Sequence, residues 1–407
     1  MLIPPPNRST PQPLNHSSPM RLAIISSTPY YRDPAGGLAG WGPTVRELDM
    51  LATVFDEVRH LTPVHAGPPH PGCLRHAAAN VEIVAMPAIG GQSVRSRLGI
   101  FCHAPHYWRQ ILGLRRWADV VHVRCPDAVS LLALLALAPS GPRPGQRFWF
   151  KFAGNWQPGD QPEAWTYALE RWWLRNPRCR AEVTVNGTWP GMPPQVHAFH
   201  NPSFSQSEFL AAGASVMAKP PLQHEMRLLF VGRLTADKGA ERAMEITAMA
   251  RAAGIPARLD LVGSGPDEPA MRIKAADLGL TSHLCFHGWL PRPEIEPLYA
   301  RTHLLLLPSA ASEGWPKVIG EAMAHGVVPV AGNISCIADE LRRFGCGQVL
   351  APTEVAGFAA AIAAYWHHPE RLEREARLAH QHAQVFTYEN YRTAVKEMLG
   401  LVGEKLK

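Results

Sequence analysis

Two carboxylates in the segment SEGWPKVIGEAMAHG, residues 312–326, are the first candidates for chemistry in this sequence. Glu313 precedes Glu321 by eight positions, and Glu321 lies among small and apolar residues. Burying an unpaired carboxylate costs on the order of several kcal/mol. The segment therefore predicts that Glu321 binds a partner. The alternative is that Glu321 is an ordinary surface residue on an amphipathic helix.

Two cations in the segment VGRLTADKG precede these carboxylates in the sequence. Arg233 follows a predicted strand, and Lys238 opens the next predicted helix. A strand-to-helix turn already offers free backbone N–H groups and the positive end of a helix dipole. Two further cations at this turn favour a site for a diphosphate, although both residues could also be ordinary surface cations.

Two other strand ends could complete a nucleotide site. Gly265 follows the second predicted strand of this half, where a glycine permits a tight turn and close backbone approach. His287 lies in FHGWL at the end of the third strand, whose backbone groups could read the edge of a base. Each of these two signals is weak by itself.

The position of Pro316 predicts where the carboxylates lie relative to a helix. Proline suits the first position of a helix, so a helix from about Pro316 places Glu321 in its second turn. The side chain of Glu321 then tilts back toward the N-terminus, and Glu313 approaches from the preceding loop. The N–H groups that would point at an anion there belong to Trp315, Lys317 and Val318.

Apolar, β-rich runs alternate with amphipathic helical segments in both halves of the chain, which is typical of parallel sheets covered by helices. The sequence predicts an α/β protein with two doubly wound, Rossmann-like domains and a ligand cleft between the carboxyl edges of their sheets. The predicted strands are 21–27, 57–64, 81–87, 119–125, 147–154 and 181–187, then 227–233, 257–265, 283–289, 303–309, 327–332 and 347–352.

The segment 211–226 is of low complexity and is interpreted as the connection between the domains. The predicted parts of the chain are a disordered leader over 1–20, an N-terminal domain over 21–215, a C-terminal domain over 226–385, and a helix over 386–407 that returns to the N-terminal domain.

The motif Gly-Arg-x-x-x-x-Lys-Gly, followed by Glu-x7-Glu-Ala-Met-Ala-x-Gly, resembles the family-four glycosyltransferases, which have the GT-B fold. The resemblance covers residues 227–390 well and the first domain more loosely. It implies retaining transfer of a sugar from a nucleotide sugar without a metal ion or other cofactor. It also implies roles for single residues: Arg233 and Lys238 at the diphosphate, Glu321 at the ribose hydroxyls, and Glu313 with the backbone of Gly314 to Val318 at the donor sugar. Among these, Arg233, Lys238 and Glu313 would act in catalysis.

A glycine pair in the first domain, Gly36 and Gly37, resembles the pair whose backbone closes over the donor phosphate and the acceptor. Pro43 would then open the next helix. The alternative is a flexible glycine-rich loop with no ligand.

Two strand ends of the first domain could line an acceptor pocket, one with His122 and Arg124 and the other with Asn155. Many relatives carry a His-Asp pair in the second of these loops, and this sequence does not. His122 could equally be a hydrogen-bonded core residue. No catalytic base is assigned, because the leaving phosphate can take the proton of the acceptor.

Composition limits the class of protein. The 407 residues are 46% hydrophobic and 18% charged, without a run of eighteen apolar residues that could span a membrane. Seven cysteines without a C-x-x-C pair favour reduced thiols in a cytoplasmic protein and speak against a structural zinc site.

Positive charge is concentrated in the first half of the chain. Residues 1–220 carry 20 Lys and Arg against 13 Asp and Glu, whereas the remainder carries 20 against 21. Aromatic and basic residues mix in 95–119 and 165–180, which suits peripheral binding to an anionic membrane surface. The alternative is a pair of solvated helices that pack on the sheet. No nucleic-acid-binding module is recognised.

The sequence thus predicts a glycosyltransferase of the hexosyltransferase type that acts on a glycan or lipid-linked acceptor, in cell-surface polysaccharide assembly. A sugar-nucleotide epimerase on the same fold and a non-catalytic nucleotide-sugar binder are the alternatives. An epimerase needs an acid/base pair at the sugar, which the sequence does not offer. A non-catalytic binder has no reason to keep Arg233, Lys238, Glu313 and Glu321 together.

Overall fold

The structure is a computed structural model, and it describes residues 19–33, 36–89, 94–157, 163–219, 221–311 and 313–401. The side chains of 94–101, 217 and 218 lie outside this description. Most of the predicted leader, residues 1–18, and the last six residues of the predicted final helix, 402–407, also lie outside the described residues.

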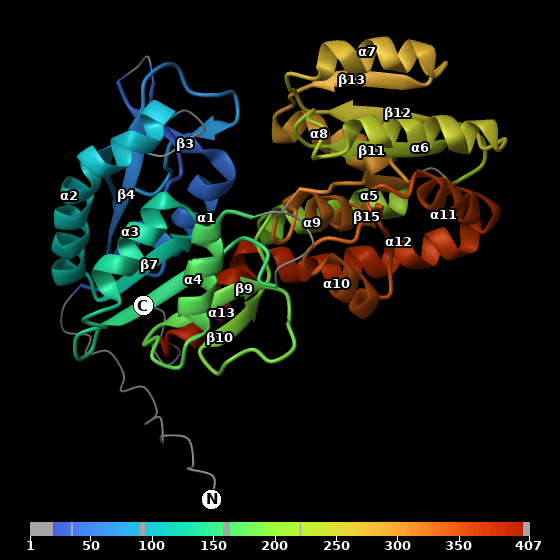
Figure 1. Cartoon of the computed structure of the whole chain (residues 1–407). Helices are drawn as coiled ribbons and strands as arrows, with labels where there is room; N and C mark the ends of the chain where they lie inside the picture. Colours follow the sequence, from blue (N-terminus) through green and yellow to red (C-terminus); the bar gives the residue numbers. More distant parts are fainter. Residues whose placement is uncertain are drawn as a thin grey trace, which may run out of the picture.

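Two β-sheets form the centres of two domains (Figure 1). The first sheet has the order β10-β9-β8-β7-β1-β4-β2-β3-β5, and β6 pairs with β4. Its pairings are parallel except those of β2 with β3 and β3 with β5. Its strands are β1 (Arg21–Ile25), β2 (Tyr30–Arg32), β3 (Leu38–Trp41), β4 (Glu57–His65), β5 (Cys73–Leu74), β6 (Val81–Pro87), β7 (Val120–Cys125), β8 (Arg147–Phe152), β9 (Glu182–Asn186) and β10 (Val196–Phe199).

The second sheet is parallel throughout, with the order β13-β12-β11-β14-β15-β16. Its strands are β11 (Met226–Val231), β12 (Ala257–Val262), β13 (Leu284–Gly288), β14 (Leu304–Leu307), β15 (Val328–Gly332) and β16 (Gln348–Leu350). The predicted α/β architecture with two sheets is confirmed. The short strands β2, β3, β5 and β10 were not predicted, because two to four residues carry little periodic signal.

Helices cover both sheets. Those of the first half are α1 (Gly42–Ala52), α2 (Val94–Trp117), α3 (Ala128–Leu137), α4 (Trp165–Arg175) and α5 (Gln206–Ala218). Those of the second half are α6 (Ala240–Ala252), α7 (Glu268–Asp277), α8 (Arg292–Arg301), α9 (Lys317–Ala324), α10 (Ile337–Phe344), α11 (Val355–His367), α12 (Pro369–Ala383) and α13 (Tyr388–Met398). None of the helices in the described chain is long and apolar enough to cross a membrane.

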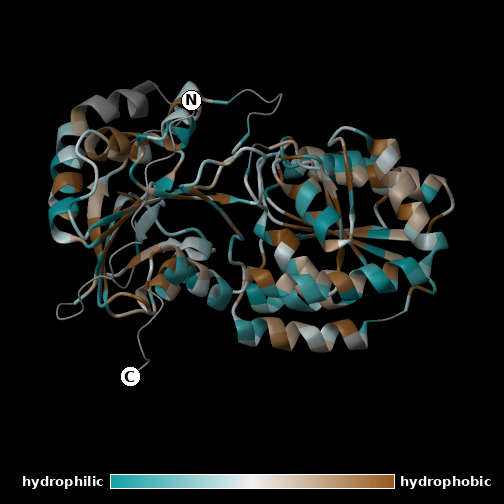
Figure 2. Ribbon diagram, turned by 90° about the horizontal axis from the view of Figure 1, so that it is seen from below, coloured by the Kyte–Doolittle hydropathy of each residue, from teal (hydrophilic) through white to brown (hydrophobic). Residues whose placement is uncertain are grey.

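The first sheet is buried on both faces, as β1 illustrates. Leu22 and Ile24 belong to a core cluster that includes residues of α1 and α13, whereas Ala23 and Ile25 belong to the cluster that includes residues of α2 and α3. Successive side chains of a strand point to opposite faces, so a strand covered on both sides must be apolar throughout. Hydrophobic residues accordingly dominate the strands inside each domain in Figure 2.

The chain crosses between the domains twice. Helix α5 begins with a capping box of Ser205 and Glu208 and contacts α8, α9 and α12. The segment interpreted as a connection, 211–226, is therefore helical up to Ala218, because it is rich in good helix formers. At the other end of the chain α13 contacts α1, so the last described helix lies on the first domain (Figure 1).

Candidate active site between the two domains

The loops after β11 and β14 bring one predicted cation, Lys238, and one predicted carboxylate, Glu313, into contact. The ammonium of Lys238 donates to the carboxylate of Glu313 at 2.9 Å, and the hydroxyl of Ser309 donates to the same carboxylate at 3.3 Å. The side chains of Lys238 and Glu313 remain 18% and 26% exposed. Because water reaches this ion pair, Lys238 or Glu313 can release the other side chain and bind a ligand in its place.

Close backbone contacts explain the glycines around this pair. A Cβ on Gly265 would lie 2.1 Å from the carbonyl oxygen of Leu234, and one on Gly239 would lie 2.2 Å from that of Pro308. Gly239 also has a positive φ of 84°. The loops after β11, β12 and β14 therefore pack backbone to backbone, which only glycine permits. The prediction of close approach at Gly265 is confirmed, although its contact with a ligand remains a prediction.

Arg233 extends from the same loop into solvent. The hydroxyl of Thr235 donates to Asp237 at 2.5 Å and is the main reason that the pKa of Asp237 lies below its usual value. Arg233 and Lys238 lower that pKa further, because both stand close to this carboxylate. The loop therefore carries two cations around one surface carboxylate.

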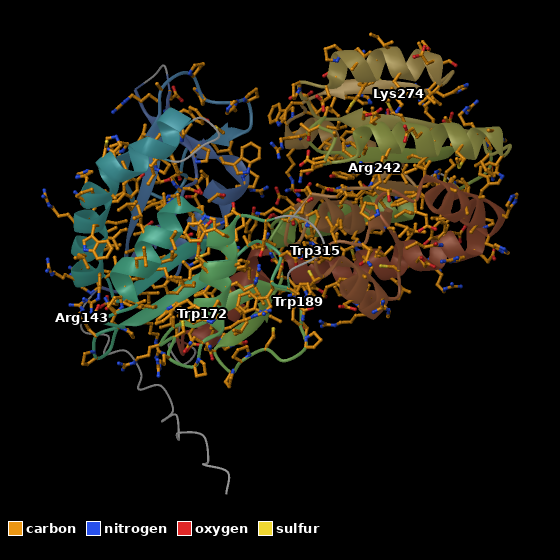
Figure 3. All side chains as sticks on the ribbon, in the orientation of Figure 1. Arg143, Trp172, Trp189, Arg242, Lys274 and Trp315 are labelled. Atoms are coloured by element: carbon orange, nitrogen blue, oxygen red, sulfur yellow. The ribbon has the colours of Figure 1, made fainter. Side chains whose placement is uncertain are left out.

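Helix α9 begins at Lys317, one residue later than predicted, and Pro316 is the residue immediately before it. No described residue accepts a hydrogen bond from the backbone N–H groups of Trp315, Lys317 or Val318. Free N–H groups at a helix start, with the helix dipole, attract an anion. The ring of Trp315 is buried between the domains and stacks on Phe386 at 5.0 Å, so it anchors the loop (Figure 3).

Glu321 faces the first domain from the second turn of α9, as predicted. The hydroxyl of Tyr299 donates to its carboxylate at 3.2 Å. Burial and the charge of Glu321 raise the pKa of Tyr299 well above its usual value, so this hydroxyl stays protonated. Glu321 also lies close enough to Arg46 and Lys317 to favour their charged forms. The carboxylate of Glu321 therefore has a hydrogen-bond donor and two nearby cations, which offset the free-energy cost of its partial burial.

A buried carboxylate of the first domain, Glu47 in α1, is the centre of a cluster that sequence analysis did not predict. It accepts from Arg124 at 2.6 Å, from Lys151 at 2.7 Å and from the hydroxyl of Tyr391 at 3.0 Å. Lys317, from the second domain, lies 4.0 Å away. These five residues, named the Glu47 cluster below, come from α1, β7, β8, α9 and α13.

Charge and burial oppose each other in the Glu47 cluster. Burial alone would raise the pKa of Glu47, but the cations, with Arg124 first, hold it well below its usual value. Burial lowers the pKa of Lys151 to about 7 and that of Lys317 to about 8, although Glu47 partly offsets this effect. One carboxylate faces three basic groups, so the cluster carries excess positive charge beside the N-terminus of α9.

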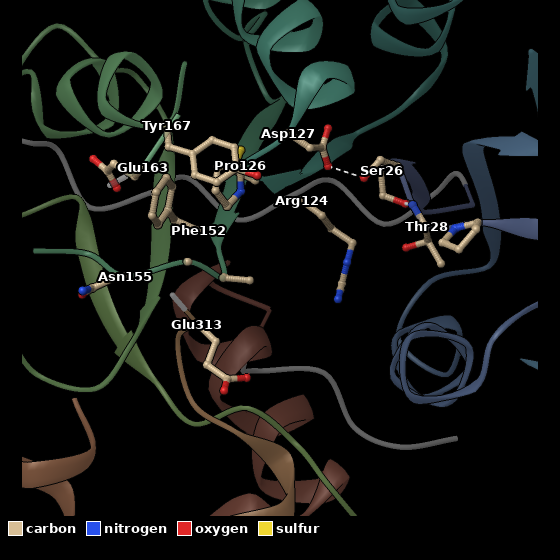
Figure 4. Close-up of a pocket in the computed structure, with 15 residues that line it drawn as sticks. Ser26, Thr28, Arg124, Pro126, Asp127, Phe152, Asn155, Glu163, Tyr167 and Glu313 are labelled. Atoms are coloured by element: carbon tan, nitrogen blue, oxygen red, sulfur yellow. Dashed lines mark hydrogen bonds between the residues drawn. The ribbon is translucent and has the colours of Figure 1, made fainter. Parts of the chain in front are cut away.

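A cavity of about 380 Å³ opens next to Glu313 on the side of the first domain (Figure 4). The loops after β1, β7 and β8 and the start of α4 form its walls. Its lining includes the predicted residues Arg124, Asn155 and Glu313, together with Phe152 and Tyr167. The Oδ1 atom of Asn155 is buried and has no hydrogen-bond partner among the described residues. The volume of this cavity is near the lower limit for ligand pockets. It can therefore hold one or two sugar rings.

Three predicted residues of the first domain do not reach this cavity. His122 is fully buried in β7, one pleat below Arg124, and stacks on Trp149 with ring centroids 3.7 Å apart. Its prediction as an acceptor-side residue was wrong, because the sheet covers it, and the core alternative holds. Gly36 and Gly37 lie in the turn between the antiparallel strands β2 and β3 and do not line the cavity.

The glycine that opens α1 is Gly42, and it is followed by Pro43, whose position near the helix start is confirmed. The carbonyl of Pro43 accepts from Lys317 of the second domain at 3.3 Å. The segment Gly-Trp-Gly-Pro, and not Gly36-Gly37, therefore meets α9. A search for glycine followed by proline at a helix start could have found it.

One group in the described residues could hold a metal ion, namely Asp260, Cys285 and His287, whose ligand atoms lie within 4.8 Å of one another. Both carboxylate oxygens of Asp260 are engaged, one by His287 at 2.7 Å and the other by Arg301 at 3.2 Å. A guanidinium beside the carboxylate disfavours a cation there. The imidazole of His287 thus contacts Asp260 on the neighbouring strand of the same sheet. The predicted contact with a base would therefore have to come from the backbone of His287.

Comparison of the sequence with protein families matches residues 217–382 to the family Glycosyl transferases group 1. The 2-deoxystreptamine glucosyltransferase of Streptomyces kanamyceticus is 30% identical over 148 residues, which are 36% of this chain and 38% of that protein. The amylovoran biosynthesis glycosyltransferase AmsK of Erwinia amylovora is 32% identical over 146 residues, 35% of this chain and 36% of that protein. The chain therefore spans less than half the length of these curated relatives.

Solved structures resemble almost the whole chain. Sucrose-phosphate synthase from Thermosynechococcus elongatus has a TM-score of 0.67 at 17% identity and covers 94% of this chain and 99% of its own. Anabaena Alr3699/HepE, solved in complex with UDP, has a TM-score of 0.62 at 16% identity and covers 94% of this chain and 100% of its own. These similarities establish the predicted GT-B fold.

Proposed function

We propose that the protein is a retaining, metal-independent glycosyltransferase that moves a sugar from a nucleotide sugar to a glycan or lipid-linked acceptor. The observation that carries the proposal is the ion pair of Lys238 and Glu313 beside the free N-terminus of α9, at the edge of a cavity of the first domain. The family match of residues 217–382 supports the same activity.

The charges at this site suit the departure of a diphosphate. Negative charge grows on the leaving phosphate as the bond to the donor sugar breaks, while the sugar becomes cationic. Arg233, Lys238 and the N–H groups that open α9 would stabilise the phosphate. Glu313 would lie beside the sugar, where its negative charge favours the cationic transition state. The leaving phosphate would take the proton of the acceptor, so no protein base is needed.

The proposed donor is a uridine-diphosphate sugar. The resemblance to a protein solved with UDP and with UDP-glucose supports this choice. Tyr299 positions Glu321 for the ribose hydroxyls, a charge-assisted pairing that would be strong in a closed cleft. The excess positive charge of the Glu47 cluster would draw the diphosphate toward the space between the domains.

The proposed setting is assembly of a cell-surface polysaccharide in the cytoplasm, with peripheral binding to an anionic membrane as a further hypothesis. Trp172 of α4, labelled in Figure 3, is 60% exposed. Trp165 of the same helix is 73% exposed, and Trp108 of α2 is 40% exposed. Exposed tryptophans on a basic domain suit a membrane interface. Flotation with anionic liposomes at low salt tests this hypothesis, and a protein that stays at the bottom of the gradient contradicts it.

A panel of nucleoside diphosphates in a thermal-shift assay tests the donor site. We expect UDP to raise the melting temperature equally with and without EDTA, because ligand binding stabilises the folded state. The double variant Arg233→Ala/Lys238→Ala should lose the shift. Stabilisation that appears only with added metal, or that persists in the double variant, would contradict the proposed diphosphate site.

Incubation of the protein with the donor in the absence of an acceptor separates the transferase from an epimerase. A transferase should release the nucleoside diphosphate slowly by hydrolysis. Accumulation of a second, epimeric nucleotide sugar would instead support the isomerase.

A further inference from the structure

The cavity beside Glu313 has two electrically different ends. Its Arg124 end belongs to the Glu47 cluster, where positive charge is in excess. Its other end is formed by Asp127, which follows β7, and by Glu163 and Tyr167 near the start of α4 (Figure 4). Asp127 and Glu163 thus add two carboxylates to that of Glu313 in the lining of this cavity.

Asp127 is a carboxylate without a cation. One of its oxygens accepts from the hydroxyl of Ser27 at 2.5 Å, and the other accepts from the backbone N–H of Ser130 at 2.8 Å. Within the described part of the chain it forms no ion pair, whereas Glu163 pairs with Arg171 and Glu313 pairs with Lys238. A buried carboxylate that lacks a counter-ion binds a cation more favourably than one that is already paired.

A second carboxyl group, that of Glu170, lies behind Asp127 and holds a proton at neutral pH, so it adds no negative charge there. Glu170 is fully buried, accepts from the Ser130 hydroxyl at 2.8 Å, and leaves its Oε1 atom without a partner among the described residues. Burial raises the pKa of Asp127 and raises the pKa of Glu170 to about 8. Burial and then the charge of Asp127 also raise the pKa of Tyr167, so this end of the cavity resists further negative charge.

We infer that this cavity is the acceptor site and that it selects an acceptor whose sugar or cyclitol ring carries a protonated amine, held by Asp127. The inference rests on the proposed transferase function and narrows its acceptor class. The ammonium group would supply the counter-ion that Asp127 lacks and donate hydrogen bonds to its free lone pairs. The rings of Phe152 and Tyr167 would contact the apolar face of the sugar.

The same geometry disfavours an anionic acceptor in this cavity. A uronate or a phosphate placed at the Asp127 end would face a carboxylate at close range, which costs affinity. Among the described residues of the lining, the only guanidinium is that of Arg124, and it is already engaged by Glu47. Amine recognition and anion recognition are therefore opposite outcomes of one experiment.

The test measures binding of four methyl glycosides, those of glucosamine, glucose, N-acetylglucosamine and glucuronic acid, to the full chain in saturating UDP. We expect the glucosaminide to bind at least about tenfold more tightly than the glucoside, because a buried charge pair adds to the hydrogen bonds common to both. The N-acetyl compound and the glucuronide should bind more weakly than the glucosaminide. A wild-type protein that does not prefer the amine overturns the inference.

Asp127→Asn removes the charge but keeps an N-cap residue for α3, so the local fold is preserved. We expect it to abolish the amine preference while binding of the glucoside is unchanged. The matched control is Asp119→Asn at the opposite end of β7, where Asp119 accepts from the backbone N–H of Arg21. Amine preference that survives in Asp127→Asn, or that is lost equally in the control, overturns the assignment of the charge to Asp127.

Binding of UDP, measured on the same samples, separates the two levels of the proposal. UDP binding without amine preference refutes the acceptor inference and leaves the transferase standing. Failure of UDP and of UDP-glucose to bind refutes the transferase function itself.

Discussion

Two carboxylate–cation clusters lie where the domains meet, and they differ in their access to water. The pair of Lys238 and Glu313 is 18% and 26% exposed, whereas Glu47 is 0% exposed and its partner Lys151 only 5%. The first pair can open to admit a phosphate at small cost. The second cannot open without leaving buried charges unpaired. We therefore expect similar side chains to bind a ligand in the first cluster and to hold the domains together in the second.

The two clusters also differ in where their residues lie in the sequence. Lys238 and Glu313 occupy motif positions in one domain, so a ligand explains why they occur together. The partners of Glu47 come from both domains and from the last helix. If this comparison holds, variants of the first cluster should mainly lose activity, and variants at Glu47 should mainly lose stability.

Glu47→Gln should give the largest loss of stability. The substitution leaves Arg124 and Lys151 buried without an opposite charge, and breaking such a cluster costs about 3–5 kcal/mol. Chemical denaturation monitored by circular dichroism measures the change. The control is Glu82→Gln, which removes an exposed partner of Arg59 and should cost less than about 1 kcal/mol. An equal loss of unfolding free energy in Glu47→Gln and Glu82→Gln would contradict the structural role assigned to the Glu47 cluster.

Lys238→Ala should change activity rather than stability. We expect kcat/KM for sugar transfer to fall by about 100-fold, since a positioned group that stabilises the leaving charge contributes about that much. The free energy of unfolding should fall by less than about 1 kcal/mol, because the pair with Glu313 is partly exposed to water, at 18% and 26%. Initial rates and denaturation curves of the same preparation decide between these effects.

Gly314→Ala should separate the domains slightly. A Cβ on Gly314 would lie 2.2 Å from the side-chain nitrogen of Asn186 and 2.4 Å from the carbonyl oxygen of Ala153, both in the first domain. Overpacking of this kind costs about 1–3 kcal/mol. Gly113→Ala in α2 is the matched control, because its Cβ would meet nothing and alanine favours a helix. Loss of stability in the control as well would point to a general effect of alanine.

Glu170→Gln should flatten the dependence of stability on pH. Burial raises the pKa of Glu170 from 4.5 to about 8, so the folded state holds a proton that the unfolded state releases. The stabilisation is complete below pH 4.5 and is lost as the pH rises to about 8, with a slope of at most about 1.4 kcal/mol per pH unit. Denaturation curves across this range should show that the free energy of unfolding falls less with rising pH in the variant than in the wild type.

Tyr299→Phe should have the smallest effect. It removes the hydrogen bond to Glu321, which contributes about 0.5–1.5 kcal/mol, and leaves the ring in place. We expect the KM for the donor to rise a few-fold with kcat nearly unchanged, because Glu321 would be less well oriented toward the ribose. A change in kcat alone would contradict this role.

The sequence predicted the second domain better than the first for a physical reason. Arg233, Lys238, Glu313 and Glu321 lie at strand ends and a helix start, and the carboxyl ends of parallel strands meet at one edge. Sequence position therefore places them together once the strands are recognised. The glycine at 265 was predictable on the same grounds, since two loops that cross at a sheet edge need close backbone contact.

The first domain depended on information that no local pattern carries. Glu47 looks like an ordinary polar residue of an amphipathic helix, and only the docking of α13 and α9 buries it. His122 and Arg124 share one face of β7, and strand length alone decides that only the second reaches the cavity. The short strand β3 separates Gly36 and Gly37 from the start of α1, and no local pattern predicted that strand.

The position of α13 has a consequence for protein synthesis. Tyr391, Val395 and Leu399 complete the core cluster that Leu48 and Leu51 of α1 begin. A ribosome delivers the chain from its N-terminus. The last strand of the first sheet ends at Phe199 and α13 begins at Tyr388, so part of one face of this sheet stays uncovered while the residues between them are translated. The second domain, whose sheet lies within residues 226–350, has no such delay and can mature first.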